Sequence, residues 1–278
     1  MLFLIFGALF LLFWAALSVS LPLLRRAGAL VARVLARASA RWSRIGTLSQ
    51  RFDPYLPVAL VVVAGAFLTA WAGDNFLDLG ELVHAKNASL QQFDGGVHAW
   101  AVSQRSASST LFFLLMTTVG SPVTLGLISG WVSVGLVATR RFRWALYFVV
   151  TVGGGALLNL ELKRYFARAR PAVAEMLRQA HGYSFPSGHA MGSTVVFGAL
   201  SYLAFRTVKG WRWKAAALAF AATLAVGISL SRVYLGVHWI SDVAAGVLAG
   251  SMWVGITTVS YETLRRLRML RYRVRGSG

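Results

Sequence analysis

The chain has 278 residues, 57% of them hydrophobic, and its mean hydropathy is +0.62. Soluble domains are usually about 45–50% apolar, so this composition excludes an ordinary soluble protein. The sequence contains no cysteine, which excludes disulfides, thiolate chemistry and Cys-ligated zinc or iron–sulfur sites. The net charge of +19 would suggest nucleic acid in a soluble protein. Here the basic residues lie in short loops between apolar runs, which favours membrane lipids as partners and no nucleic acid.

Long apolar runs predict an all-α fold, a polytopic membrane helical bundle. About 20 apolar residues, at ~1.5 Å each, cross the ~30 Å hydrocarbon core as a helix. The predicted spans cover about residues 2–23, 55–73, 110–138, 144–162, 189–206, 214–231 and 237–260. We expect the third span to be kinked or broken at Gly120, Ser121 and Pro122.

Charge predicts the orientation of these spans. Most of the 28 lysines and arginines fall in the stretches 24–52, 140–143, 206–214 and 263–278. These stretches should all lie on the cytoplasmic side. The opposite side then receives 74–108, 163–188 and the turn near 232–236 as loops. The segment 163–188 is nevertheless basic, and binding of an anion would explain why it departs from the charge rule.

The N-terminal part predicts two elements. Met1–Leu24 lacks the basic start of a signal peptide, so we expect a true span with its N-terminus outside. Residues 27–45 carry arginines at helical spacing, which favours an interfacial amphipathic helix over a soluble linker helix. The predicted division is an N-terminal helix and basic segment (1–52), a membrane domain (53–262) and a basic cytoplasmic tail (263–278).

Three polar motifs lie at span ends on the predicted outer side. The first runs from Lys163 to Pro171, with Arg170 before the proline. The second is Pro186-Ser187-Gly188-His189. The third begins at Ser231-Arg232 and continues to His238 and Asp242. Segments far apart in the chain should therefore meet at one membrane depth.

The motifs together predict a site for a phosphate-sized anion. Lys163, Arg170 and Arg232 supply positive charge, and arginine matches phosphate oxygens with two parallel hydrogen bonds. Ser187 adds a hydroxyl, and Gly188 allows its backbone N–H to approach a ligand closely. A helix that opens at His189 would direct its N-terminal amides toward an anion.

Two histidines add reactivity to this site. His238 and Asp242 are four residues apart and would share one face of a helix. The carboxylate would fix the imidazole tautomer and leave the other ring nitrogen free as a nucleophile. His189 has a free pKa of about 6.5, which suits a general acid.

These three motifs resemble the signature of the type 2 phosphatidic acid phosphatase superfamily, which includes vanadium haloperoxidases and glucose-6-phosphatase. The resemblance covers about residues 55–260 and departs at Ala169, where many relatives have proline. It implies a six-helix lipid phosphatase core, here with an added N-terminal transmembrane helix and interfacial helix. It implies that His238 attacks phosphorus, Asp242 orients it and His189 protonates the leaving oxygen. Lys163, Arg170, Ser187, Gly188 and Arg232 would hold the phosphoryl oxygens, with no metal and no cofactor.

The predicted function is hydrolysis of a lipid phosphomonoester or diphosphate at the periplasmic face of a bacterial inner membrane. The candidates are phosphatidic acid, phosphatidylglycerol phosphate, undecaprenyl pyrophosphate and lipid A phosphate. Phosphotransfer to another acceptor, a vanadate haloperoxidase and a non-catalytic lipid-binding or transport protein are the alternatives. Three other histidines are expected to face lipid headgroups: His84, His98 and His181. For Arg164, Arg168 and Arg178, contact with headgroups is favoured over a direct role in binding the phosphate.

Overall fold

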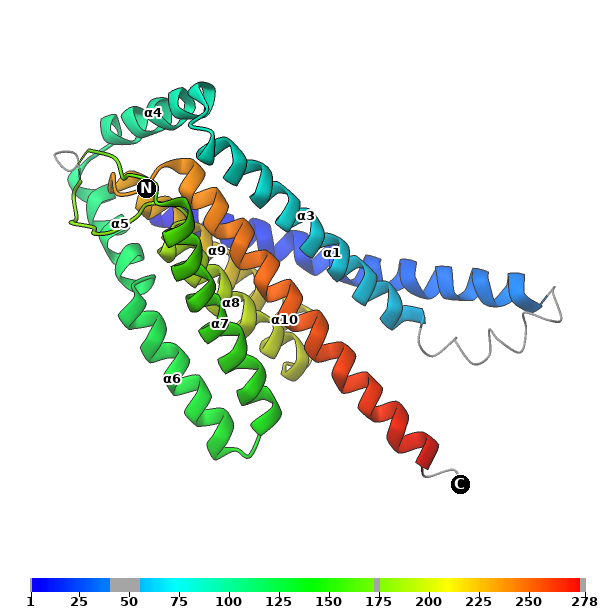
Figure 1. Ribbon diagram of the computed structural model, residues 1–278. Coiled ribbons are helices and arrows are strands. Elements are labelled where there is room, and N and C mark those ends of the chain that lie inside the picture. Colours follow the sequence, from blue (N-terminus) through cyan, green and yellow to red (C-terminus); the bar gives the residue numbers. More distant parts are fainter. Residues whose placement is uncertain (1, 41–55, 173–175, 276–278) are drawn as a thin grey trace.

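The computed structural model describes residues 2–40, 56–172 and 176–275, and within these ranges it consists of helices and connecting loops (Figure 1). The helices are α1 (Leu2–Ala40), α3 (Leu56–His84), α4 (Ala88–Ser103), α5 (Ala107–Val119), α6 (Pro122–Ala138), α7 (Phe142–Phe166), α8 (Gly188–Thr207), α9 (Trp211–Tyr234) and α10 (Ile240–Arg275). A helix occupies the position of every predicted span, which confirms the all-α membrane bundle.

Three helices, α7, α9 and α10, are each long and apolar enough to cross a membrane, as judged by length and composition over the described residues. α5 and α6 are bent by 45° at a short break, and they meet the same length and composition criteria when the pair is taken as one span. Ser121 caps α6 by accepting a hydrogen bond from Thr124 N at 3.1 Å, and Pro122 opens the new helix without losing a bonded N–H. The predicted break is confirmed, and the chain is an integral membrane protein.

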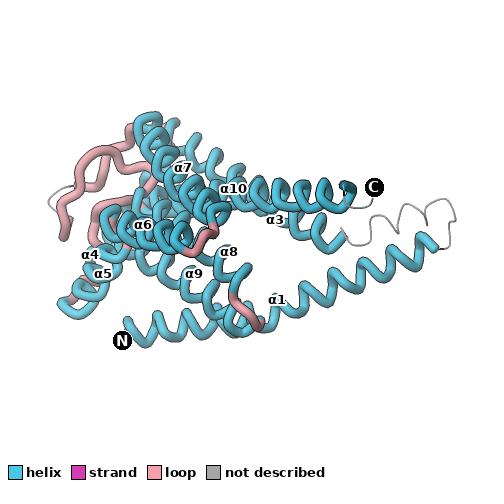
Figure 2. Tube along the Cα trace, turned by 90° about the horizontal axis from the view of Figure 1, so that it is seen from below, coloured by secondary structure: helices cyan, strands magenta, loops and turns pink. Residues whose placement is uncertain are grey.

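The N-terminal region differs from the prediction in one respect. The predicted span and the interfacial segment form a single continuous helix, α1, that passes through Pro22 and reaches Ala40. Residues 41–45 of the predicted amphipathic segment lie outside the described residues. α1 packs along α9 (Figure 2), where Trp14 Nε1 donates to the carbonyl of Arg212 at 3.0 Å.

The stretch 74–108, which was predicted to be a loop, is largely helical. α3 continues to His84, and α4 then crosses the end of the bundle (Figure 1). The side chain of Asn87 caps α4 by accepting a hydrogen bond from Leu90 N at 3.0 Å. α4 buries two polar side chains, Asp94 and His98, which are 1% and 6% exposed. The prediction that His98 faces headgroups is therefore wrong, because its ring packs against Trp239.

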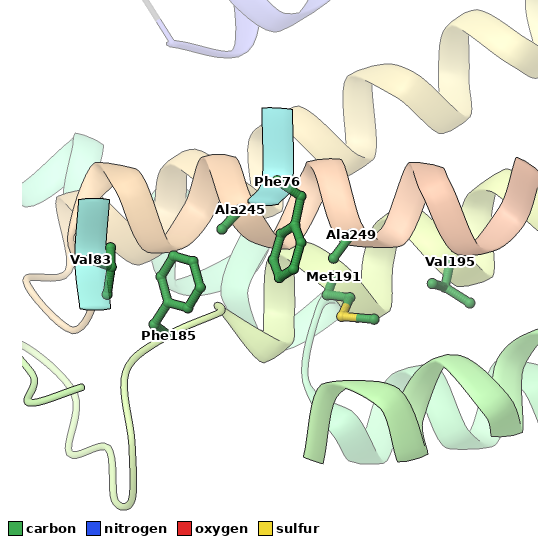
Figure 3. Packing of buried hydrophobic residues seen from close by; sticks show 7 residues of the cluster. All are labelled: Phe76, Val83, Phe185, Met191, Val195, Ala245 and Ala249. Atoms are coloured by element: carbon green, nitrogen blue, oxygen red, sulfur yellow. The ribbon is translucent and has the colours of Figure 1, made fainter. Parts of the chain in front are cut away.

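The core beside the polar motifs joins α3, α8 and α10. Phe185, which precedes the second motif, is fully buried and packs against Phe76 of α3 and Met191 of α8 (Figure 3). Gly246 lets α10 approach α8 closely, because a Cβ there would lie 2.7 Å from the carbonyl oxygen of Ser187. The start of α8 is thereby held directly against α10.

The opposite end of the bundle is basic, as the charge pattern predicts. The α6–α7 turn, the end of α8 and the last part of α10 surround a cavity of about 640 Å³. Its charged lining residues are Arg140, Arg141, Arg143, Arg206, Arg265 and Arg268. The predicted boundary between membrane domain and tail, at 262–263, falls inside α10.

Candidate active site

The three motifs meet in one cavity of about 900 Å³ at the end of the bundle that carries α4. The predicted site residues that line it are Lys163, Arg170, Gly188, His189, Arg232 and His238. The other two, Ser187 and Asp242, are fully buried, and Ser187 N donates to the carbonyl of Asp242 at 2.9 Å. All eight residues predicted from the sequence are therefore found in this region.

His238 lies between a carboxylate and a guanidinium. Its Nδ1 is 3.3 Å from Asp242 Oδ2, and its Nε2 is 3.1 Å from Arg170 Nη1. Arginine has no acceptor, so Nε2 accepts from Arg170 and the ring proton resides on Nδ1, which donates to Asp242. In this tautomer the Nε2 lone pair accepts from Arg170, so Arg170 has to release this hydrogen bond before Nε2 can attack a ligand in the cavity.

The pairing of His238 with Asp242 has a different local origin from the one predicted. His238 precedes α10, which begins at Ile240, so the two residues do not share a helical face. Asp242 instead lies in the first turn of α10 and turns back to accept a hydrogen bond from Trp239 N at 3.0 Å. This is half of a capping box, and it directs the carboxylate toward the residue before the helix.

The second motif places the N-terminus of α8 at the cavity. Ser187 is the N-cap, so the free amides of the first turn point toward the ligand space. In the described part of the chain Ser187 Oγ is buried without a hydrogen-bond partner. A Cβ on Gly188 would lie 3.1 Å from Asn159 Oδ1 of α7, so glycine allows this close approach. Buried polar atoms are rarely left unpaired, so the serine hydroxyl suits an anionic ligand.

The cations are fixed by contacts with the surrounding chain. Lys163 Nζ donates to the carbonyl of Tyr183 at 2.7 Å. Arg170 Nε donates to the carbonyl of Gly182 at 2.9 Å, and its other donors reach further loop carbonyls. Arg232 is buried and donates to Thr117 Oγ1 of α5, while its Nε has no partner among the described residues. The guanidinium of Arg232 thus retains a donor for a ligand.

Electrostatics favour a neutral His238. Burial lowers the pKa of His238 to about 4, although the Asp242 carboxylate acts in the opposite direction. The charges of Arg170 and Arg232 add to the lowering and also act on His189. Within the described ranges, no three His, Cys, Asp or Glu side chains lie close enough to hold a metal ion. The positive side chains that line this cavity are Lys163, Arg170, Arg178 and Arg232.

Several residues around His238 were not predicted from the sequence. Ser184 Oγ donates to Asp242 Oδ2, so the carboxylate that pairs with His238 has a second partner on the loop. Arg168, which was expected to face headgroups, instead donates to Asp242 Oδ1 at 2.7 Å. Asp94 and Ser241 complete this network. Arg168 lies inside the first motif, two residues before Arg170, and this position is the sequence signal that could have found it.

The cavity continues from the polar end into an apolar part between α6, α7 and α8. Its apolar lining includes Leu125, Val152, Gly155, Gly192 and Val195. Glycines on α7 and α8 let the helices pack closely around it, because a Cβ on Gly155 would lie 3.0 Å from Val195 and one on Gly192 would lie 3.2 Å from Leu125. The cavity thus combines a cationic end with an apolar end, which suits an amphipathic ligand.

The fold and the site define a membrane-embedded enzyme in which His189 and His238 line one cationic pocket. Residues 144–266 match the model of the PAP2 superfamily. The chain is 31% identical to lipid A 1-phosphatase of Rhizobium etli over 203 residues, which are 64% of this chain and 82% of the relative. It is 27% identical to phosphatidylglycerophosphatase B of Bacillus subtilis over 69% and 94% of the two chains.

A solved structure supports the same assignment. The crystal structure of a transmembrane PAP2 type phosphatidylglycerolphosphate phosphatase from Bacillus subtilis has a TM-score of 0.65 to this chain at 26% identity. It covers 69% of this chain and 94% of that one. The chain belongs to the PAP2 superfamily and is a membrane phosphatase.

Proposed function

We propose that this phosphatase hydrolyses a phosphomonoester or diphosphate of a membrane lipid through a phosphohistidine on His238. The observation that carries the proposal is the contact set of one imidazole. Nδ1 of His238 is held by Asp242, and Nε2 faces a cavity lined by Lys163, Arg170 and Arg232. The nucleophile, the carboxylate that orients it and the cations that stabilise charge are thus gathered around one imidazole.

In the first step, Nε2 of His238 attacks phosphorus and the bond from phosphorus to the leaving oxygen breaks. His189, from the first turn of α8, donates a proton to that oxygen. It carries this proton when the substrate is bound, because the negative phosphate offsets the charges of Arg170 and Arg232 that act on its ring. The phosphorylated imidazole is cationic, and Asp242 stabilises it through Nδ1–H. The cations and the Ser187 hydroxyl hold the phosphoryl oxygens as charge develops on them.

In the second step, water attacks the phosphorus of the phosphohistidine. His189, now neutral, takes a proton from the water, the bond between phosphorus and Nε2 breaks, and inorganic phosphate leaves. The enzyme returns to its starting tautomer, with the proton of His238 on Nδ1. The scheme needs neither metal nor cofactor.

The shape of the cavity supports a lipid substrate. The phosphoryl group would lie among the cations, and an acyl or prenyl chain would lie along the apolar lining between α6 and α8. The names of the similar proteins point to phosphatidylglycerol phosphate and lipid A phosphate as candidates. The charge pattern supports a site on the outer face of the membrane, which in a bacterium would be the periplasmic face.

Arg178 adds a positive charge to the cavity lining, beyond the proposed position of the phosphoryl group that His238 attacks. It lines the same cavity, and its charge acts on both His189 and Arg232. A second phosphate attached to the leaving oxygen would lie on the His189 side, close to this residue. A lipid diphosphate such as undecaprenyl pyrophosphate is therefore within the proposed substrate class.

The test is a phosphate-release panel with purified protein in detergent, without added divalent ions. Lipid monophosphates and diphosphates are compared for the wild type, His238→Ala and His84→Ala, an exposed histidine of α3 that serves as the matched control. We expect the wild type and the control to release phosphate and His238→Ala to release none. Undiminished turnover by His238→Ala would overturn the proposed mechanism.

A further inference from the structure

A buried carboxylate on α4 lies behind the proposed catalytic pair. Asp94 is 1% exposed and accepts three hydrogen bonds. Arg168 Nη2 donates to its Oδ2 at 2.6 Å, Ser241 Oγ donates to the same oxygen at 2.5 Å, and Ser241 N donates to Oδ1 at 3.1 Å. α4 precedes residue 144, where the PAP2 match begins, so Asp94 belongs to none of the family motifs.

Arg168 connects Asp94 to Asp242. Its Nη1 donates to Asp242 Oδ1 at 2.7 Å and to Ser241 Oγ at 2.7 Å, while Nη2 serves Asp94. The guanidinium fork therefore bridges two carboxylates, and the Arg168 side chain is 14% exposed. Each named group in the network has a partner, which is the condition for a buried polar network to hold one geometry.

Charge gives Asp94 a role beyond packing. Asp94 and Arg168 neutralise each other, so the negative charge of Asp242 remains available to the imidazole of His238. Without Asp94, Arg168 would have Asp242 as its sole anionic partner, and the network would gain one net positive charge. In a buried site, such a charge acts strongly on a developing phosphoimidazolium.

We propose that Asp94 is a positioning residue for the phosphatase reaction, acting through Arg168 and Ser241 to fix the orientation and charge balance of Asp242. The inference rests on the proposed function, in which Asp242 serves His238. α4 is then part of the catalytic apparatus. The competing role is purely structural, because Asp94 also satisfies Ser241 N in the first turn of α10 and so docks α4 on that helix.

The experiment compares Asp94→Asn, which keeps the shape and removes the charge, with Asp94→Glu, which keeps the charge. Asp78→Asn is the matched control, since Asp78 is exposed on α3. kcat and KM for phosphate release from a lipid monophosphate, and thermal unfolding, are measured for each. We expect Asp94→Asn to lower kcat by roughly 10- to 100-fold, the scale of a small misplacement of reacting groups. KM should be nearly unchanged, and Asp94→Glu should recover part of the loss.

A double-variant cycle tests the route through Arg168. Arg168→Lys keeps the positive charge but has no fork to bridge two carboxylates. Asp94→Asn combined with Arg168→Lys should therefore lose little more kcat than either change alone. If Asp94→Asn does not fold, Arg168→Lys and Asp94→Glu still have to show the loss in kcat at constant KM.

Three outcomes would overturn the inference. They are an unchanged kcat in Asp94→Asn, a loss that merely follows thermal stability, and fully additive losses in the double variant. Its failure is distinguishable from failure of the proposed function. If only the role of Asp94 is wrong, His238→Ala is still inactive. If the proposed function is wrong, His238→Ala still releases phosphate.

Discussion

His238 is surrounded so that its imidazole is neutral and its Nε2, which accepts from Arg170, lies at the cavity lining. Asp242 holds Nδ1, the charges of Arg170 and Arg232 disfavour protonation, and burial lowers the pKa to about 4. A neutral imidazole is the form that attacks phosphorus. The same residues would later stabilise the phosphoryl group, so nucleophile activation and charge stabilisation share one set of side chains.

This environment predicts the pH dependence of the reaction. Because His238 must be neutral to attack, the rate rises as pH increases through its pKa. We expect the acid limb of kcat/KM near pH 4, rather than near the ordinary histidine value of about 6.5. The measurement uses two lipid substrates whose phosphate groups differ in pKa, because a limb that moves with the substrate belongs to the substrate. A limb near 6.5 with both substrates would contradict the prediction.

At the level of elements, the site depends on how α8 and α10 meet. The N-terminus of α8 carries Ser187 and His189, while the start of α10 carries Asp242. Gly246 lets the two helices approach until the backbone of Ser187 touches α10, and Phe185 anchors the preceding loop in the core (Figure 3). The distance between the proposed acid and the proposed nucleophile is thus set by helix packing.

The substitution Gly246→Ala tests this packing. The added Cβ would lie 2.7 Å from Ser187 O and 3.1 Å from Met191 N, both backbone atoms that cannot rotate away. We expect kcat to fall by about 10- to 100-fold, as for a displacement of about 1 Å, and the thermal midpoint to fall as well. Gly153→Ala on α7 is the control, because its Cβ meets no atom within 4 Å. Equal activity of the two variants would show that this contact does not position the site.

Some site residues can be predicted from the sequence and others cannot. The difference is whether their spacing along the chain marks them. Lys163, Arg170, His189 and His238 stand in motifs whose spacing along the chain is itself the signal. Asp94 has no such signal, because its partners are 74 residues or more away and are determined only when α4 folds over the bundle. The sequence of α4 shows no strong apolar stripe, so its charge content suggested an outer loop.

At the scale of the whole molecule, polar and basic ends lie on opposite sides of an apolar bundle. The cavity with the histidines lies at the α4 end, and the arginine-lined cavity lies at the α6–α7 turn. The succession of apolar spans and basic loops predicted this arrangement, since hydropathy and charge are read directly from the chain. How α1 packs on α9 was not predictable, because it depends on contacts such as that of Trp14 with Arg212.

The absence of native cysteine makes the orientation measurable. Single cysteines at Ser103, at the end of α4, and at Thr139, in the α6–α7 turn, are both exposed positions. In intact spheroplasts we expect a membrane-impermeant maleimide to label Ser103→Cys and to label Thr139→Cys only after permeabilisation. The reverse pattern would place the site on the cytoplasmic face.

The proposed reaction depends on covalent transfer of the phosphoryl group to the imidazole of His238. Wild-type protein is mixed with a lipid carrying radiolabelled phosphate, denatured at alkaline pH within the first turnover, and digested for mapping of the label. We expect label on the peptide that contains His238, and none in His238→Ala. Label on any other residue, or phosphate release with no label on His238, would contradict it.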